Sequence, residues 1–355
     1  MNAVRVAIIG CGKIAEKHIA SLTELGGEAA LAGLYDLNAE RLKSFTESVR
    51  KTAFPDVAGF ASVEELLAHS GADLVVVASS SDSHASLALQ ALRAGKHVLA
   101  EKPLALSMEE AREVIDEAAG RGLVAAVSFQ ARYLPQMLAV KQAAEQGRFG
   151  AIGHGVVSMR WRRPLDYYKE SPWRESWSKG GGLFMNQCIH YIDLLQWILG
   201  PVRSVYARAS ASGQDIGVEN TGAAVLTFKN GAIGMIEAST HVYPSSLGTS
   251  LGVFGERGSV LLGGALLDDI SVWKFEASSE ADREIPQPQA GGISHTPLYR
   301  DLISAIRTGS VPLTAAESSL ATHEIVLALY RSIASGKTVE LPLQTFSMSK
   351  MAWME

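Results

Sequence analysis

The sequence has little cysteine, no excess of positive charge and no long apolar run. Its 355 residues include only two cysteines, Cys11 and Cys188, so a disulfide framework is not expected and a reducing compartment fits. The formal net charge of −5 gives no electrostatic basis for nucleic-acid binding. No apolar run is long enough to cross a bilayer, and no signal-peptide pattern opens the chain. We therefore expect a cytoplasmic protein that binds neither nucleic acid nor membrane.

The composition and the order of the patterns indicate an α/β protein of two domains. The length exceeds that of a usual single core, and a hydrophobic content of 47% with 19% charged residues excludes disorder. Strands alternating with helices up to residue 129 predict a doubly wound parallel sheet. Strands and tight turns from 202 to about 275 predict a large, open and mostly antiparallel sheet. We expect domains at 1–127 and 128–345, and a tail at 346–355 that no pattern interprets.

The first strand leads into a glycine-rich turn that is typical of dinucleotide binding. Residues 4–9 form an apolar strand, and residues 10–15 follow the pattern G-x-G-x-x-A before a helix. Gly10 permits the tight turn, and Gly12 lets the backbone approach a pyrophosphate. That pyrophosphate would lie at the helix N-terminus, beside Lys13 and Ile14. The turn therefore predicts a dinucleotide-binding Rossmann domain.

Polar residues follow the next strands at the positions where a nucleotide would lie. Asp36 comes at the end of the second strand, where the fingerprint expects an acid that binds the ribose hydroxyls. Its charge would repel a 2′-phosphate, which favours NAD over NADP. Alternatively, Asp36 only caps the helix that starts near Asn38. Ser79 and Ser81, just before His84, suit close approach of a nucleotide and suit N-capping equally well.

The segment Glu101, Lys102 and Pro103 ends another predicted strand, at 97–101. A residue before proline is pushed out of the helical region, so Lys102 should stop the strand and present its amine at the strand's C-terminal end. Ligands bind at that end in open α/β sheets. The alternative is a surface ion pair between Glu101 and Lys102.

Residues 161–179 are rich in arginine and aromatic residues and show no strong periodicity, which suggests a functional loop. Rings and guanidinium groups suit sugars, uronates or diphosphates through stacking and bidentate hydrogen bonds. Ordinary loop packing or a subunit contact is the alternative. The residues concerned are Trp161, Arg162, Arg163, Tyr167, Tyr168, Trp173, Arg174 and Trp177.

Three glycines at 180–182 then open a helix that carries Asn186, His190 and Asp193. Their spacing allows one helix face to hold all three side chains. The spacing also suits metal ligands, but Asn is a poor ligand and no Cys/His cluster joins it. We therefore expect an active-site face without a metal.

Together these motifs resemble the Gfo/Idh/MocA family of oxidoreductases over nearly the whole chain. The resemblance rests on the turn at 10–15, the segment at 94–103 and the helix that carries Asn186 and His190. It implies a Rossmann domain followed by an α/β domain whose sheet mediates homodimers or homotetramers. It also implies a cis peptide bond between Lys102 and Pro103.

The resemblance assigns roles to individual residues. It implies that Lys102 contacts the substrate hydroxyl and the nicotinamide ribose, and that His190 is the acid/base. Asn186, where many members have Asp, would position a hydroxyl. Gln130 and Arg132 match a Gln-x-Arg segment near the nicotinamide, and Glu101 would lie on the nicotinamide side. The expected site is completed on the cofactor side by Ser79, Ser81, His84, Trp161 and Arg162, and on the substrate side by Tyr133, Arg163, Tyr168 and Trp173.

Within the family, residues 185–197 and 167–174 look most like nucleotide-sugar 3-dehydrogenases that act on UDP-N-acetylglucosaminuronate. We therefore expect an NAD-dependent enzyme that moves a hydride between nicotinamide and a secondary hydroxyl or ketone of a sugar or nucleotide sugar. A myo-inositol or free-sugar dehydrogenase, an NAD-assisted glycosidase, and a non-catalytic sugar or nucleotide sensor are alternatives. The presence of both Lys102 and His190 argues against the sensor, which needs neither.

Overall fold

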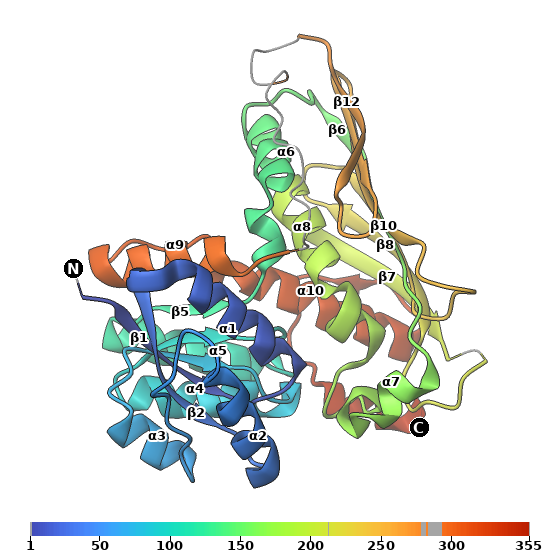
Figure 1. Cartoon of the computed structure of the whole chain (residues 1–355). Helices are drawn as coiled ribbons and strands as arrows, with labels where there is room; N and C mark the ends of the chain where they lie inside the picture. Colours follow the sequence, from blue (N-terminus) through green and yellow to red (C-terminus); the bar gives the residue numbers. More distant parts are fainter. Residues whose placement is uncertain (1, 212, 278–281, 283–292, 355) are drawn as a thin grey trace. The chain divides into compact units, whose positions relative to one another are not determined.

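The protein was analysed as a computed structural model that describes residues 2–211, 213–277, 282 and 293–354 (Figure 1). Residues 276–293 are polar and contain proline and glycine, which predicts a loop, but they fall mostly outside the described residues. Contacts divide the chain into two units: unit 1 holds residues 1–130 and 294–320, and unit 2 holds residues 131–293 and 321–355. After the large sheet, the chain thus returns to unit 1, a return that the sequence patterns did not indicate.

Unit 1 is built on a five-stranded parallel sheet with the strand order β2-β1-β3-β4-β5. The expected doubly wound sheet is confirmed. All four positions of β3 are buried, because helices cover both faces of such a sheet and leave no strand face to solvent. The strands are β1 (Val4–Ile9), β2 (Ala29–Tyr35), β3 (Leu74–Val77), β4 (His97–Ala100) and β5 (Ala125–Val127).

The helices of unit 1 begin where the sequence supplies capping groups. Asn38 accepts the Arg41 N–H at the start of α2, and Ser107 accepts the Glu110 N–H at the start of α5, as is usual for N-cap residues. The helices are α1 (Lys13–Leu25), α2 (Ala39–Val49), α3 (Val63–His69), α4 (His84–Arg93), α5 (Met108–Arg121) and α9 (Thr296–Thr308).

Unit 2 is built on an eight-stranded sheet with the order β12-β11-β10-β6-β9-β8-β7-β13. Only the β6–β9 pair is parallel, which confirms a mostly antiparallel sheet. The patterns did not single out β12 or the two-residue β13. The strands are β6 (Ile152–Arg160), β7 (Val202–Ser210), β8 (Thr221–Phe228), β9 (Ile233–Ser239), β10 (Gly248–Gly255), β11 (Gly258–Gly263), β12 (Asp269–Phe275) and β13 (Val339–Glu340).

Helices α6 (Pro135–Glu145) and α8 (Ile189–Leu199) cover one face of this sheet (Figure 1). A short helix, α7 (Leu165–Lys169), lies within the arginine-rich segment, and α10 (Ala316–Ser335) runs from unit 1 into unit 2. No helix among the described residues is long and apolar enough to cross a membrane.

The C-terminal tail, which no sequence pattern interpreted, has a definite structure. It forms a 3₁₀ helix at Met348–Met354, and the side chains of Phe346, Met348 and Met351 are buried.

Candidate functional site

The expected site residues fall into two sets, one in each unit. In unit 1 the glycine-rich turn after β1 has the geometry that its pattern predicts. Gly10 has φ +103°, and a Cβ there would lie 2.5 Å from the Ala78 carbonyl oxygen. At Gly12, by contrast, an added Cβ meets nothing within 4 Å. Gly12 precedes α1 and has no side chain that caps it, so N–H groups at this helix start suit an anionic oxygen.

The structure contradicts one of the two interpretations of Asp36, and ribose binding stays a prediction. Asn38, and not Asp36, is the N-cap of α2. The Asp36 carboxylate instead accepts the N–H of Cys11 and the N–H of Asn38, each at 2.8 Å, and Arg41 lies 3.5 Å from Oδ1. Asp36 is therefore fixed beside the glycine-rich turn. Each carboxylate oxygen keeps lone-pair capacity for a ribose hydroxyl.

The loop after β3 is tied to the end of β4 by His84. The imidazole places Nδ1 2.7 Å from the Pro103 carbonyl oxygen and Nε2 3.1 Å from the Ser79 carbonyl oxygen. Burial lowers the pKa of His84, although both carbonyl contacts act in the opposite direction. The Ser79 hydroxyl pairs with that of Ser83, and Ser81 is buried. His84 thus links the loop after β3 to the loop after β4. A cofactor contact by Ser79, Ser81 or His84 stays a prediction.

The segment that ends β4 has the expected peptide geometry. The bond between Lys102 and Pro103 is cis, and the Lys102 side chain is half-buried rather than fully solvated. Glu101 is 5% exposed and contacts His18. The interpretation of Glu101 and Lys102 as a solvent-exposed surface ion pair is therefore wrong. Gln130, at the end of unit 1, has a buried Oε1 without a hydrogen-bond partner among the described residues.

In unit 2 the helix that carries Asn186 and His190 starts with a π-helical turn, Phe184–Cys188, before α8. Such turns occur frequently at functional sites. Asn186 is buried and His190 is half-buried. Asp193 does not join them, because Arg132 Nε and Nη2 donate to its two oxygens at 2.7 and 2.5 Å, in a buried ion pair. The expected three-residue face is therefore reduced to Asn186 and His190.

The start of this π-helical turn is held by Glu219, a residue that the sequence patterns missed. Its carboxylate accepts the Trp177 indole N–H at 2.7 Å, the Tyr330 hydroxyl at 2.6 Å and the Phe184 N–H at 3.3 Å. The Tyr330 hydroxyl in turn accepts the Met185 N–H at 3.2 Å. These groups satisfy amide donors at a helix start, which otherwise lack partners.

The Glu219 carboxylate also explains the last of the three glycines. Gly182 has φ +78°, and a Cβ there would overlap the Glu219 carboxylate. Burial raises the pKa of Glu219, although the hydrogen bonds from Tyr330 and Trp177 act in the opposite direction. The only local signal was an acid before Asn220 in a strand-rich region, which does not indicate burial.

The arginine-rich segment forms a stacked cluster of rings and guanidinium groups. Arg163 lies over Trp161 and Tyr167, at 4.8 and 5.1 Å from the ring centroids. Arg174 lies 4.2 Å from the Tyr167 centroid and 5.6 Å from the Trp173 centroid. Tyr167 therefore contacts two cations. Guanidinium groups that are oriented in this way retain N–H donors for an anionic ligand.

The other expected residues of this segment differ in their surroundings. Tyr168 is 2% exposed, and its hydroxyl lies 3.0 Å from Thr240 Oγ1, so it packs the segment from within. Trp161 donates its indole N–H to Thr249. Arg162 is exposed, and its backbone N–H is bound by Ser246. Tyr133 and Trp173 are half-buried.

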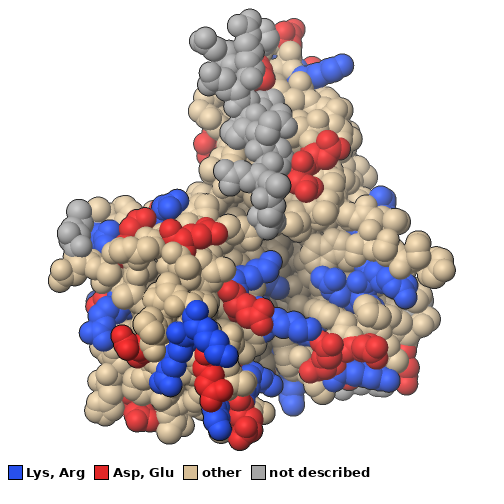
Figure 2. Space-filling model, in the orientation of Figure 1, with Lys and Arg blue, Asp and Glu red and all other residues tan. Residues whose placement is uncertain are grey.

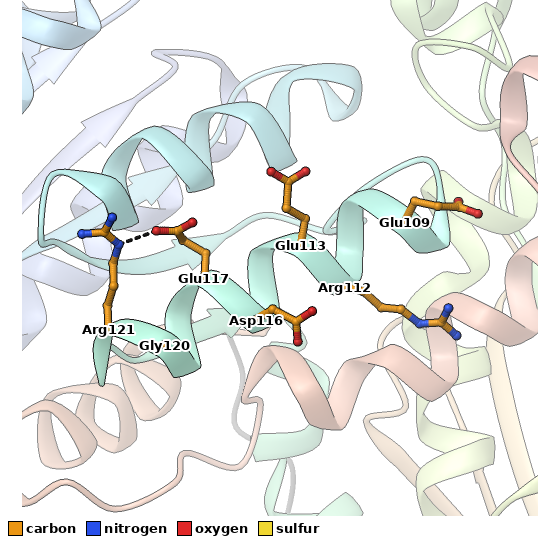
Figure 3. A pocket seen from close by; sticks show the side chains of 7 residues that line it. All are labelled: Glu109, Arg112, Glu113, Asp116, Glu117, Gly120 and Arg121. Carbon is orange, nitrogen blue, oxygen red and sulfur yellow. Dashed lines mark hydrogen bonds and ion pairs between the residues drawn. The ribbon is translucent and has the colours of Figure 1, made fainter.

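Charged side chains of both signs lie on the face that Figure 2 shows, with Lys and Arg interspersed with Asp and Glu. A hollow of about 770 Å³ lies on α5, but Figure 3 shows that α5 alone supplies its lining, with Arg121 paired to Glu117. This is a solvated, charged helix face, and none of the expected site residues lines it. A second cavity, of about 520 Å³, adjoins Trp177 and Glu219.

Comparison with known families and structures agrees with this arrangement. Residues 4–129 match the model of the oxidoreductase family with an NAD-binding Rossmann fold, and residues 137–261 match the GFO/IDH/MocA C-terminal domain.

Three known proteins illustrate the similarity. The WlbA dehydrogenase from Bordetella pertussis, solved in complex with NADH and UDP-GlcNAcA, is 34% identical, with a TM-score of 0.90 over 97% of this chain and 99% of that chain. The WlbA dehydrogenase from Chromobacterium violaceum, in complex with the same two ligands, is 34% identical, with a TM-score of 0.90 over 97% of both chains. The inositol 2-dehydrogenase of Rubrobacter xylanophilus is 32% identical over 72% of this chain and 70% of its own length.

Proposed function

Since the chain belongs to the GFO/IDH/MocA family of NAD-binding oxidoreductases, we propose that it oxidises the C3 hydroxyl of UDP-N-acetylglucosaminuronate or of a closely similar nucleotide sugar. The observation that carries this proposal is the similarity to two WlbA dehydrogenases with UDP-GlcNAcA, which extends over 97% of this chain. The stacked Arg163 and Arg174 support it, because a diphosphate or uronate needs bidentate cationic donors.

The residues of unit 1 fit NAD. The open position at Gly12 and the start of α1 suit the pyrophosphate, and the fixed Asp36 carboxylate suits two ribose hydroxyls. The same carboxylate would repel a 2′-phosphate. NAD, when bound there, accepts the hydride from the substrate carbon.

The chain's own residues would manage the proton and the developing charge. His190 takes the proton of the substrate hydroxyl, a task that imidazole suits because it titrates near neutral pH. Lys102 donates a hydrogen bond to the same oxygen as it becomes a carbonyl, which stabilises charge that develops in the transition state. The Asn186 amide holds the hydroxyl in place and does not take its proton.

A substrate panel tests this function. Purified protein is incubated with NAD and UDP-N-acetylglucosaminuronate, UDP-N-acetylglucosamine, free glucuronate or myo-inositol, while NADH absorbance and product mass are followed. We expect turnover mainly with the first. Preference for myo-inositol would instead favour an inositol dehydrogenase, which the relative from Rubrobacter xylanophilus represents. Release of an aglycone without net NADH would favour a glycosidase.

Two substitutions test the assigned roles. His190→Ala and Lys102→Met should each lower kcat by roughly 10²–10⁴-fold, while the Kd of NAD, measured by fluorescence titration, changes little. Leu138→Ala on the exposed surface of α6 is a control that should leave kcat unchanged. Near-normal turnover of the two variants on the best substrate would show that these residues have other roles.

We also propose a homo-oligomer that pairs through the uncovered face of the unit 2 sheet. Tyr206, Val225 and Met235 lie in one row across β7, β8 and β9, and all three are exposed, as is Ile233. Neighbouring exposed apolar side chains in a sheet are typical of an interface. Val225→Glu should convert a dimer or tetramer to a smaller species in light scattering. A monomeric wild-type protein would contradict the proposal.

A further inference from the structure

A chain of hydrogen bonds runs through the interior of unit 1 and ends at the backbone of Lys102. It begins at Tyr299 on α9, whose hydroxyl lies 2.9 Å from His18 Nδ1. His18, on α1, places Nε2 3.2 Å from Glu101 Oε1. The other oxygen of Glu101 accepts the Lys102 N–H at 3.3 Å. Tyr299 and His18 are fully buried, and Glu101 is 5% exposed.

Burial and the acceptor-only Glu101 carboxylate together determine the direction of this chain. Burial raises the pKa of Tyr299 well above its usual value, so its hydroxyl stays protonated. Burial lowers the pKa of His18, which favours the neutral ring. Because a carboxylate only accepts, the ring N–H lies on Nε2, which faces Glu101, and Nδ1 accepts the Tyr299 hydroxyl. Burial alone would raise the pKa of Glu101, but the neighbouring rings of His18 and His295 outweigh it and hold that pKa well below 4.5. The carboxylate is therefore an acceptor with a defined donor.

His295 completes the cluster. The ring centroids of His295 and His18 are 4.8 Å apart, with an angle of 52° between the ring planes. His295 Nε2 is 3.6 Å from Glu101 Oε1. Among the residues that the structure describes, neither ring nitrogen of His295 has a hydrogen-bond partner. The ring thus encloses the Glu101 carboxylate on a second side and limits its rotation.

The same three side chains have the composition of a metal site, and their ligand atoms lie within 4.8 Å of one another. Two observations favour a hydrogen-bonded cluster instead. A structural zinc takes four protein ligands, and only three such residues group here within the described chain. A divalent ion beside one carboxylate would also leave net positive charge in a buried place, which is costly. The Tyr299–His18–Glu101 chain needs no such ion.

We infer that His18 and Tyr299 are positioning residues for Lys102, an inference that rests on the proposed function. The Glu101 carboxylate accepts the Lys102 N–H, and His18 donates from Nε2 to that carboxylate. Tyr299 donates to His18 Nδ1 and so stabilises the tautomer with the proton on Nε2. If any link is lost, the carboxylate can rotate and the backbone that carries the Lys102 amine is no longer fixed. A small displacement of a catalytic group costs a large part of the rate.

The segment of the chain that returns to unit 1 after the large sheet supplies Tyr299 to this arrangement. Helix α9 packs against α1 and brings Tyr299 to His18, 281 positions away in the sequence. The start of α1 is also the proposed pyrophosphate site. One rigid helix therefore links the cofactor-binding turn to the backbone of Lys102.

The first test compares two substitutions of one residue. His18→Leu removes the donor to Glu101, whereas His18→Gln keeps an N–H at a similar reach. We expect kcat to fall roughly 10- to 100-fold in His18→Leu and to be largely restored in His18→Gln, with the KM of the sugar substrate nearly unchanged. His69→Leu, on the exposed end of α3, is the matched control. An equal loss in the Leu and Gln variants would overturn the inference.

The second test asks whether His18 acts through Lys102. In a Lys102→Met background, His18→Leu should lower the residual kcat by less than about twofold, because the group that it positions is gone. An undiminished effect of His18→Leu would show an independent role and refute the inference. If Lys102→Met alone retained full turnover, the proposed function of Lys102 would fail, which is a separate outcome.

Tyr299→Phe supplies a variant that keeps the ring and therefore the packing. It should lower kcat less than His18→Leu does, and combining the two should add little, since both break the same chain. Metal analysis of the purified protein completes the test. Stoichiometric zinc that is lost in His295→Ala would overturn the inference, because Glu101 would then be a metal ligand.

Discussion

The carboxylate of Glu219 offers a quantitative test of how unit 2 holds the turn that carries Asn186. Three buried donors converge on it, from Trp177, Tyr330 and Phe184. Glu219→Ala would leave all three without their acceptor. Glu219→Gln keeps the shape but places an amide N–H₂ where one oxygen stood, so that one donor faces another donor.

The expected losses follow from the number of donors left unpaired. A buried group without its partner costs about 1–3 kcal/mol, so Glu219→Gln should lower the free energy of unfolding of unit 2 by about 1–3 kcal/mol. Glu219→Ala adds two further unpaired donors and a cavity. Because water can enter that cavity and satisfy some donors, we expect a loss of about 3–5 kcal/mol.

The contribution of Glu219 to the free energy of unfolding depends on pH, and its sign follows from the pKa. Burial raises the folded-state pKa of Glu219 above the ordinary value of 4.5. A carboxyl group with a raised pKa contributes stability that is fully present below its unfolded pKa and is lost as the pH rises through the folded pKa. Wild-type stability should therefore contain a component that declines above pH 4.5. Glu219→Gln should lack that component.

Urea unfolding followed by tryptophan fluorescence measures both effects, because Trp177 donates to the carboxylate. Wild-type, Glu219→Gln and Glu219→Ala proteins are compared from pH 4.5 to 8, with Glu317→Gln, at the start of α10, as a control. Stability of Glu219→Gln equal to that of wild type at every pH would refute the argument. So would a Gln variant that is less stable than the Ala variant.

Three further predictions concern unit 1. Asp36→Ser should weaken NAD binding at least about tenfold and improve NADP binding, because the carboxylate is gone and Arg41 remains; fluorescence titrations with both cofactors measure this. Gly10→Ala should lower the thermal midpoint of unfolding, because its Cβ would meet the Ala78 carbonyl. Gly12→Ala has open space for its Cβ, so it should weaken NAD binding without loss of stability. Calorimetry of each variant, with and without NAD, separates a loss of stability from a loss of binding. Burial raises the pKa of the Cys11 thiol to about 12, so iodoacetamide should label it at pH 8 only after unfolding, as mass spectrometry can show.

Local sequence patterns were sufficient to predict those features whose conformation depends on residues that are close in the sequence. The strand at 4–9 occupies the predicted residues, because buried parallel strands are continuous apolar runs. Gly10 adopts the positive φ that its turn requires. The family resemblance led to Lys102 and to its cis bond with Pro103. These features are encoded within a few residues.

Local patterns failed where a polar side chain is shared between helices. The spacing of Asn186, His190 and Asp193 predicted one face, but Arg132 takes Asp193 into a buried ion pair. No spacing rule indicates that competition, because the partner lies 61 positions away. The role of His84 was likewise invisible, since backbone carbonyls carry no sequence signal.

The sequence by itself determined the two kinds of sheet and the dinucleotide-binding turn, and it predicted the residue types of the candidate site. Only the tertiary structure decided that Glu219 and Tyr330 hold the turn that carries Asn186, and that Tyr299 and His18 hold Glu101 beside Lys102. The physical reason is that apolar periodicity and glycine geometry act over a few residues. Pairing of buried polar groups instead depends on which distant segments the fold brings within about 3 Å of each other.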